Sequence, residues 1–406
     1  MRNINYKDEQ KIKFCLFCGS ILLMISFYYI KNMSCGQRAV NVGIIGCGQR
    51  AWGYVKRFDA LEHLHLVAVC DTDGNRSRFF ASEVDRIYKL KVKSYTDTQS
   101  LIDNEDVDIM FICTPDHSHL HVFKQICNDI KNIVIEKPMC ISMNECKELD
   151  CIKQEQKVNV FVPFVLRFSN IFRRMNELLP KIGNITRFDY KLDLNNKHSA
   201  SYYRRWHRKR KNCGSFLLTK GCHDIDVILW MNGAGFNDVK MMGNVRVFNP
   251  RNRTQCSSCD DDCKFRFAGG YVFMTDKDIE DCHRFDACIF NNDHDIMDHF
   301  SCMVNYNDYI CTYSSTMYQE NGNRQILING TKGYISCDYM ASTVTLKVGN
   351  KAKEVFVIES KSSTGHKGCD QAFLENMLKA FRKNEDLFYQ ESLSCIRLCE
   401  LLEESR

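Results

Sequence analysis

A short glycine-containing turn between an expected strand and an expected helix constrains this chain most strongly. Residues 42–45 are apolar and predict a buried strand, and they are followed by the run Gly46-Cys47-Gly48-Gln49-Arg50-Ala51 and a helical pattern to about residue 61. A second apolar run, residues 64–70, ends in Asp71, 20 positions beyond Ala51. This order of strand, G-x-G-x-x-A turn, helix, strand and acid is the fingerprint of a dinucleotide-binding unit.

Each part of the fingerprint has a mechanical reason. Gly46 permits the tight turn, Gly48 lets the backbone approach a pyrophosphate, and Ala51 keeps the helix close to the strand. The helix N-terminus adds N–H donors and a positive dipole end. Asp71 would accept a hydrogen bond from the ribose 2′-OH and repel a 2′-phosphate, which predicts NAD, although Arg76 softens that preference and leaves NADP possible. The alternative interpretation is a glycine turn with only a structural role.

Further strands are expected after this unit, with helices at residues 122–128 and 143–156 between them. Residues 107–113 lead into Thr114-Pro115, residues 132–135 lead into Glu136-Lys137-Pro138, and residues 159–166 form a third apolar run. Strands that alternate with helices predict a parallel, doubly wound sheet. Ligands bind at the carboxyl ends of such strands, so Asp71, Thr114 and Lys137 are expected at one edge.

The pattern changes at about residue 181. Residues 187–194 alternate polar and apolar, and strand candidates at 271–274, 301–315, 325–329, 342–348 and 354–358 follow without the regular strand–helix alternation. Helical patterns at 370–382 and 392–403 close the chain. We therefore expect an α/β protein with an N-terminal Rossmann parallel sheet (residues 40–180), followed by an α+β domain with a mostly antiparallel open sheet (residues 181–406). The open sheet makes a homo-oligomer plausible.

One expected helix in the second half, residues 216–230, carries chemistry. Thr219, His223 and Asp226 lie at i, i+4 and i+7 and share one face of an amphipathic pattern, which Lys220 borders. A histidine braced by a hydroxyl and a carboxylate is a plausible proton carrier. The alternative is a solvated surface histidine.

The N-terminal segment, residues 1–39, predicts a signal peptide or a membrane anchor. Residues 14–30 carry no charge, follow Arg2, Lys7, Lys11 and Lys13, and would span roughly 26 Å as a helix, just short of a bilayer core. The basic flank predicts that the remainder is luminal in the secretory pathway, and five Asn-x-Ser/Thr triplets give weak support. The alternative is a misassigned start and a cytoplasmic protein.

Composition excludes some functions and leaves others open. A chain of 406 residues accommodates two domains, and a net charge of +5 is too small for a dedicated nucleic-acid binder.

The basic run at residues 204–211, which contains Trp206, is interpreted as a loop near the substrate mouth; there it would favour an acidic or phosphorylated substrate. Cys256, Cys259 and Cys263 fit zinc with Cys282 or His283, disulfides, or unpaired thiols. No metal is expected in the chemistry.

Taken together, these residues resemble the family of glucose–fructose oxidoreductase, inositol dehydrogenase and rhizopine-catabolism oxidoreductases (Gfo/Idh/MocA). The resemblance covers most of the chain after residue 40 and is carried by Gly46 to Ala51, Cys70-Asp71, Thr114-Pro115-Asp116-His117-Ser118-His119, Glu136-Lys137-Pro138, and residues 217–230, 328–333 and 366–370. It implies NAD(P)-dependent oxidation or reduction at a carbinol carbon of a sugar, cyclitol or related polyol. Two alternatives are an NAD-assisted glycosidase of the same fold and a catalytically degenerate binding protein.

The resemblance also implies roles for single residues. Lys137 would stand beside the nicotinamide and the reacting hydroxyl, and His223 would accept the hydroxyl proton. Many relatives carry an aspartate where this chain has Thr219, so either His223 acts alone or Lys220 takes part. The other implied contacts are to the cofactor from Gln49, Arg50, Thr114, Pro115, His119 and Glu136, and to the substrate from Arg167, Trp206, Thr219 and Lys220.

Overall fold

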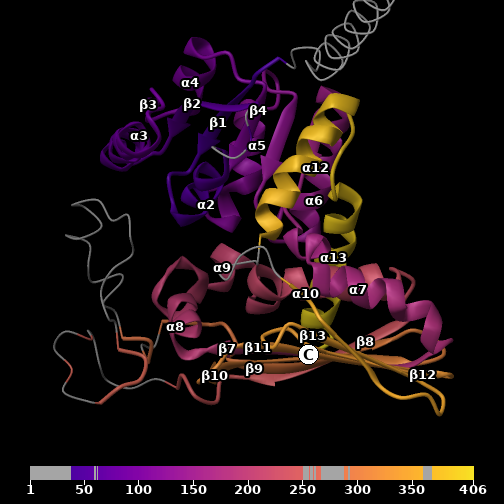
Figure 1. Ribbon diagram of the computed structural model, residues 1–406. Coiled ribbons are helices and arrows are strands. Elements are labelled where there is room, and N and C mark those ends of the chain that lie inside the picture. Colours follow the sequence, from indigo (N-terminus) through magenta and orange to yellow (C-terminus); the bar gives the residue numbers. More distant parts are fainter. Residues whose placement is uncertain are drawn as a thin grey trace, which may run out of the picture.

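The computed structural model describes residues 38–406 except 59–60, 62, 250–255, 257–258, 260–261, 267–287, 291–292 and 360–367. The charge-free segment 14–30, the strand expected at 271–274, Cys282, His283 and residues 366–367 lie outside the described residues. Within that described part, every helix is too short or too polar to cross a bilayer. Two sheets with helices packed between and around them organise the chain (Figure 1).

The first sheet has six strands in the order β3-β2-β1-β4-β5-β6. All its pairs are parallel, as the sequence predicted, whereas β3 was not expected. Its strands are β1 (Val40–Ile45), β2 (Leu64–Cys70), β3 (Lys93–Tyr95), β4 (Ile109–Ile112), β5 (Asn132–Ile135) and β6 (Asn159–Phe161). The helices between them are α2 (Gln49–Phe58), α3 (Gly74–Tyr88), α4 (Thr98–Asn104), α5 (His119–Ile126) and α6 (Met143–Gln156). All four residues of β4 are buried, as expected for a parallel strand covered on both faces.

The second sheet has eight strands in the order β14-β13-β12-β11-β7-β10-β9-β8, and all pairs are antiparallel except β7 with β10. The strands are β7 (Ile185–Asn195), β8 (Asp238–Asn244), β9 (His299–Asn305), β10 (Ile310–Gln319), β11 (Asn323–Gly330), β12 (Gly333–Asp338), β13 (Thr343–Val348) and β14 (Glu354–Val357). The predicted open, mostly antiparallel sheet is therefore confirmed. The single candidate at residues 301–315 is in fact two strands, β9 and β10.

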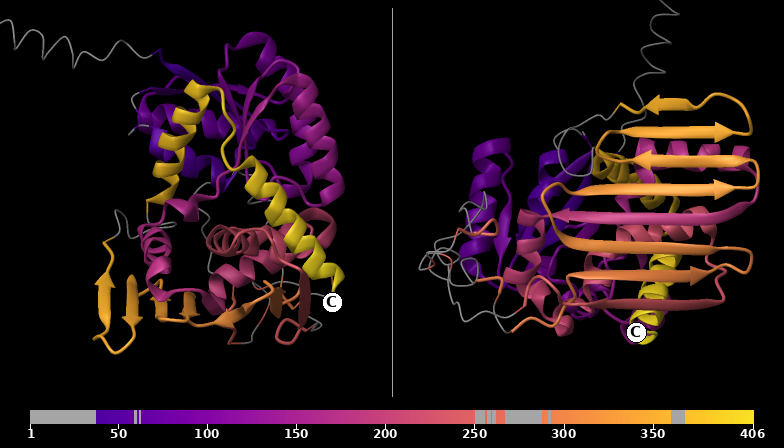
Figure 2. Two further views of the ribbon diagram at one scale, coloured as in Figure 1. Left: turned by 90° about the vertical axis from the view of Figure 1, so that its right-hand side faces the viewer. Right: turned by 90° about the horizontal axis from the view of Figure 1, so that it is seen from below.

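Helices cover one face of the second sheet and leave the other open (Figure 2). They are α7 (Asn170–Leu178), α8 (Asn196–Arg204), α9 (Arg210–Cys213), α10 (Cys222–Asn232) and α13 (Tyr389–Glu404), with short turns η1 (Asp116–Ser118), η2 (Val165–Phe168), η3 (Leu179–Ile182), η4 (Trp206–Arg208) and the π-helical turn η5 (Leu217–Gly221). Alternate residues of β10 point to the two sides: Cys311 and Tyr313 are buried, whereas Thr312 and Ser314 are partly exposed on the open face.

Helix α12 (Cys369–Lys383) returns from the second sheet to the first domain. Phe373, Leu374 and Met377 are fully buried in the same apolar cluster as β1 and α2. The chain then forms a bridge from Leu387 to Phe161 of β6 before α13 begins. The predicted division at residue 180 therefore does not account for α12, which packs in the core of the parallel sheet.

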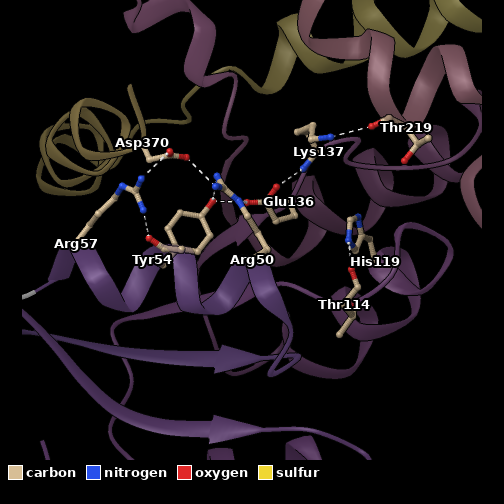
Figure 3. A network of polar contacts seen from close by, with 10 residues as sticks. Arg50, Tyr54, Arg57, Thr114, His119, Glu136, Lys137, Thr219 and Asp370 are labelled. Carbon is tan, nitrogen blue, oxygen red and sulfur yellow. Dashed lines mark hydrogen bonds and ion pairs between the residues drawn. The ribbon is translucent and has the colours of Figure 1, made fainter. Parts of the chain in front are cut away.

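A polar network fixes α12 against α2 and the end of β5 (Figure 3). Arg50 donates from Nη1 to Asp370 Oδ1 at 2.7 Å, and Arg57 pairs with the other Asp370 oxygen at 3.2 Å. Arg50 also donates from Nε to Glu136, which accepts a further hydrogen bond from Tyr54. The Asp370 carboxylate is almost fully buried, so the two guanidinium groups compensate its lost hydration.

This network predicts a stability effect. We expect Asp370→Asn to lower the free energy of unfolding by about 1–3 kcal/mol, because Arg50 and Arg57 lose their buried counter-charge. The control is Glu375→Gln on the exposed side of α12, which should change it by less than about 0.5 kcal/mol. Urea unfolding followed by tryptophan fluorescence measures both; equal effects of the two variants would contradict the prediction.

Candidate functional site

One cavity of about 1320 Å³ joins the two domains at the carboxyl ends of the parallel strands. On the side of the parallel sheet it is lined by Gly46, Gly48, Gln49, Arg50, Asp71, Arg76, Thr114, Pro115, Asp116, Glu136 and Lys137. On the side of the second domain it is lined by Tyr202, Trp206, Thr219, Lys220 and His223. The strand ends that the sequence placed at one edge therefore lie together.

The glycine turn forms a cradle that fits a dinucleotide. Gly46 has φ +95°, and a Cβ there would lie 2.8 Å from the backbone of Cys113, so only glycine fits. A Cβ on Gly48 would meet no atom within 4 Å, which leaves open space above the turn for a pyrophosphate. Ala51 is fully buried in the first turn of α2, and that turn carries no acidic side chain. The residues present thus fit the cofactor that the fingerprint predicts.

Asp71 is held at the adenosine end of this cradle. Its Oδ2 accepts from the Cys47 N–H and its Oδ1 from the Asp73 N–H, both at 2.9 Å. Arg76 lines the same end of the cavity. A fixed carboxylate in this place suits a ribose 2′-OH, as NAD presents.

Lys137 lies where β5 ends and reaches across to the second domain. Its Nζ donates to the Thr219 carbonyl oxygen at 2.8 Å. Burial alone would lower the pKa of Lys137, but Cys222, Tyr202 and the carboxyl groups nearby outweigh it and raise that pKa. The ammonium therefore stays protonated at neutral pH.

Asp116 faces Lys137 from the turn after β4. Thr219 Oγ1 donates to Asp116 Oδ2 at 2.6 Å. Burial raises the pKa of Asp116 to about 7, although the ammonium of Lys137 opposes the shift. Sequence reasoning did not single out this residue; the signal was its place one residue beyond Thr114-Pro115 at a strand end.

The neighbouring residues Glu136 and His119 hold Lys137 in place. Glu136 is occupied by Arg50 and Tyr54. The His119 ring nitrogens contact the Pro138 carbonyl at 2.9 Å and the Thr114 carbonyl at 3.0 Å, and the ring is fully buried (Figure 3). The implied cofactor contact of His119 is therefore corrected: the ring ties two strand-end loops together and does not line the cavity.

His223 lines the cavity, but its expected brace is engaged elsewhere. Asp226 accepts from Arg167 Nε at 2.9 and 3.0 Å and from Nη2 at 2.8 Å. Arg167 also pairs with Glu391 at 3.5 Å and lies outside the cavity lining, so the expectation that it faces the substrate is corrected. The reason is that α10 is buried around most of its circumference, which leaves Asp226 needing a buried counter-charge.

Residues 204–208 of the basic run 204–211 line the substrate side of the cavity, and some charges of the run are paired. Arg208 donates to Asp293 at 2.8 Å and Arg210 to Glu403 at 2.7 Å. Trp206 stacks on His207 with ring centroids 3.6 Å apart. Among the residues that the structure describes, no three histidine, cysteine or acidic side chains gather as a metal site, and Cys282 and His283 are not among them.

The comparisons with known proteins agree with this geometry. Residues 40–164 match the model of the oxidoreductase family with an NAD-binding Rossmann fold, and residues 177–401 match its C-terminal alpha/beta domain. The YteT protein of Bacillus subtilis is 22% identical over 379 residues, which cover 83% of this chain and 88% of that protein. Inositol 2-dehydrogenase of Salmonella typhimurium is 24% identical over 206 residues, which cover 50% of this chain and 57% of the enzyme.

The solved structure of levoglucosan dehydrogenase with NADH and levoglucosan has the same fold. It superposes with a TM-score of 0.69 at 16% identity and covers 91% of this chain and 97% of its own. Family models match both halves of the chain, and the glycine turn and the ends of β4 and β5 lie within the residues matched to the NAD-binding Rossmann fold. The chain belongs to the Gfo/Idh/MocA oxidoreductase family.

Proposed function

We propose that this protein is an NAD-dependent dehydrogenase that acts on a carbinol carbon of a sugar, cyclitol or related polyol. The observation that carries the proposal is the single cavity in which Lys137 and His223 lie together beyond a dinucleotide cradle. The names of similar proteins, inositol 2-dehydrogenase and levoglucosan dehydrogenase, support a polyhydroxylated substrate.

The residues of this chain divide the work along the cavity. Gly46, Gly48 and Asp71 would hold the cofactor, which when bound supplies the acceptor of a hydride. The Lys137 ammonium, fixed by Thr219, stabilises negative charge that develops on the substrate oxygen as its proton leaves. The wall formed by Lys220 and His223 is where that proton is received.

The far end of the cavity suits a sugar ring. Trp206, stacked on His207, offers an aromatic surface, and Tyr202 and Asn212 offer polar groups beside it. A pocket with aromatic walls and a few placed polar groups orients a small polar ligand. The paired charges of Arg208 and Arg210 weaken the argument for a strongly acidic substrate.

The first test removes the ammonium. We expect Lys137→Met to lower kcat by about 10²–10³-fold, because the charge on the oxygen loses its stabilising partner. The measurement is the absorbance of reduced nicotinamide during a screen of inositols, sugars and anhydrosugars. The matched control, Lys147→Met, changes an exposed lysine of α6 and should leave the rate unchanged.

Three results would contradict this proposal. An unchanged rate in Lys137→Met removes the catalytic assignment. Release of a phenol from aryl glycosides without net reduction of NAD identifies a glycosidase instead. Calorimetry that finds no affinity for NAD or NADH leaves a binding protein that keeps only the fold.

The second test concerns the choice of cofactor. We expect Asp71→Asn to weaken NAD binding by about 10- to 100-fold, since a charge-assisted hydrogen bond to the ribose is lost. NADP binding should strengthen, because the carboxylate no longer repels the 2′-phosphate and Arg76 lines the same end. Calorimetric titration of both dinucleotides measures the ratio. Asp103→Asn, an exposed change on α4, is the control, and an unaltered ratio in Asp71→Asn would overturn the prediction.

A further inference from the structure

Lys220 is an enclosed lysine that lines the same cavity as Lys137 and His223. It lies in the π-helical turn η5, only 8% exposed, directly after Thr219, which anchors Lys137. No hydrogen bond or ion pair of Lys220 is found among residues 38–406 as far as the structure describes them. A lysine is rarely enclosed without a carboxylate partner, so this arrangement needs a reason.

Two cations and one carboxylate are the charged groups that act most on Lys220. Arg324 of β11 and Lys137 both act on it, whereas Asp224 is the carboxylate that would favour its charge. Asp224 is already engaged: Arg324 donates to it at 2.6 Å, Tyr190 at 2.6 Å and Tyr313 at 3.2 Å. Beyond the dinucleotide cradle, the other titratable groups that line the cavity are Asp116, His117, Glu136, His198, Tyr202, Arg204, Arg205, His207, Arg208 and His223, and Cys222 also acts on Lys220.

The two lysines of the cavity therefore differ in protonation near neutral pH. Burial, helped by Arg324 and Lys137, lowers the pKa of Lys220 to about 7. Lys137 faces Asp116 and Glu136 and has a raised pKa. Lys137 stays an ammonium, while a substantial fraction of Lys220 is a neutral amine.

We infer that Lys220 is the catalytic residue that takes the proton from the substrate hydroxyl, while Lys137 remains charged beside the same oxygen. This rests on the dehydrogenase function proposed above. The O–H bond would break as an N–H bond forms on Lys220, and the oxygen's electron pair would complete the carbonyl as the carbinol C–H bond breaks. A bound oxidised dinucleotide would supply the acceptor for the hydride. His223 then lines the wall, since its neighbouring carboxylate Asp226 is engaged by Arg167.

The protonation state is tested without any turnover. Competitive acetylation with acetic anhydride from pH 5 to 10, read by peptide mass spectrometry, gives the titration midpoint of each lysine. We expect Lys220 to reach half-maximal labelling near pH 7, and exposed Lys147 near about 10.4, the ordinary value. A Lys220 midpoint above about 9 would overturn the inference.

The role in turnover is tested by pH profiles of kcat/KM for oxidation. Only the neutral amine accepts a proton, so the wild-type rate should fall as pH drops below about 7. Lys220→Met should lower kcat by about 10²–10⁴-fold and remove that limb. Lys220→Arg should also remove it, because a guanidinium stays protonated. Lys147→Met, on an exposed side chain of α6, should keep the wild-type profile.

The outcomes separate the two proposals. The Asp116 carboxyl also titrates near 7, so Asp116→Asn should retain the limb if Lys220 causes it. An active wild type whose limb persists in Lys220→Met, or disappears in Asp116→Asn or His223→Gln alone, overturns only the assignment of Lys220. A folded wild type that binds NAD but oxidises no polyol overturns the dehydrogenase proposal, and the Lys220 role with it.

Discussion

The hydrogen bond from the Lys137 ammonium to the Thr219 carbonyl is the contact on which the site depends. It joins the end of a parallel strand to a helical turn of the other domain at 2.8 Å. A π-helical turn contains more residues than an α-helical turn, which alters the direction of its carbonyls and side chains. Here consecutive residues, Thr219 and Lys220, serve the cavity in two ways: one anchors a charged lysine, and the other is an enclosed lysine without such an anchor.

Several segments far apart in the sequence cooperate to keep Lys137 in place. Arg50 reaches from α2 to Glu136 and to Asp370 of α12, and His119 ties the loops after β4 and β5. Each of these side chains is buried or half-buried and has its polar atoms engaged, as an enclosed polar network requires. The result is a rigid edge on which the cofactor half of the cavity is built, so small shifts in α12 would be felt at the reacting atoms.

Much of the parallel domain could be predicted because local pattern and burial agree there. The expected bounds of β2, β5 and α6 are the observed ones, and the strand-end residues do line one cavity. Strands β8 and β12 were not predicted, because short, half-exposed strands lack a continuous apolar run. The packing of α12 in the core of the first domain was not predicted either, since a helical period does not indicate which sheet the helix will cover.

The partners of charged side chains were the least predictable part of the site. Asp226 shares a helical face with His223 in sequence, yet Arg167, 59 residues away, takes it. Asp116 was hidden in a recognised motif, and only the fold brings it to Thr219, 103 residues further along. Such pairings depend on which buried charges the fold brings together from different elements. The periodicity of one helix or strand contains no information about them.

The partners of the buried charges also explain how one cavity keeps two lysines in different protonation states. Burial lowers the pKa of both lysines, and the charges around each lysine decide whether that effect is offset or reinforced. The Thr219 hydroxyl that donates to Asp116 is neutral. The negative charge of the Asp116 carboxylate is therefore not offset by this contact, and it raises the pKa of Lys137. Arg324 donates to Asp224 and offsets the negative charge of that carboxylate. The same guanidinium also adds a positive charge that lowers the pKa of Lys220. A substrate hydroxyl placed between the lysines would meet a proton acceptor and a stabilising cation at once, which is the arrangement that hydride transfer from an alcohol needs.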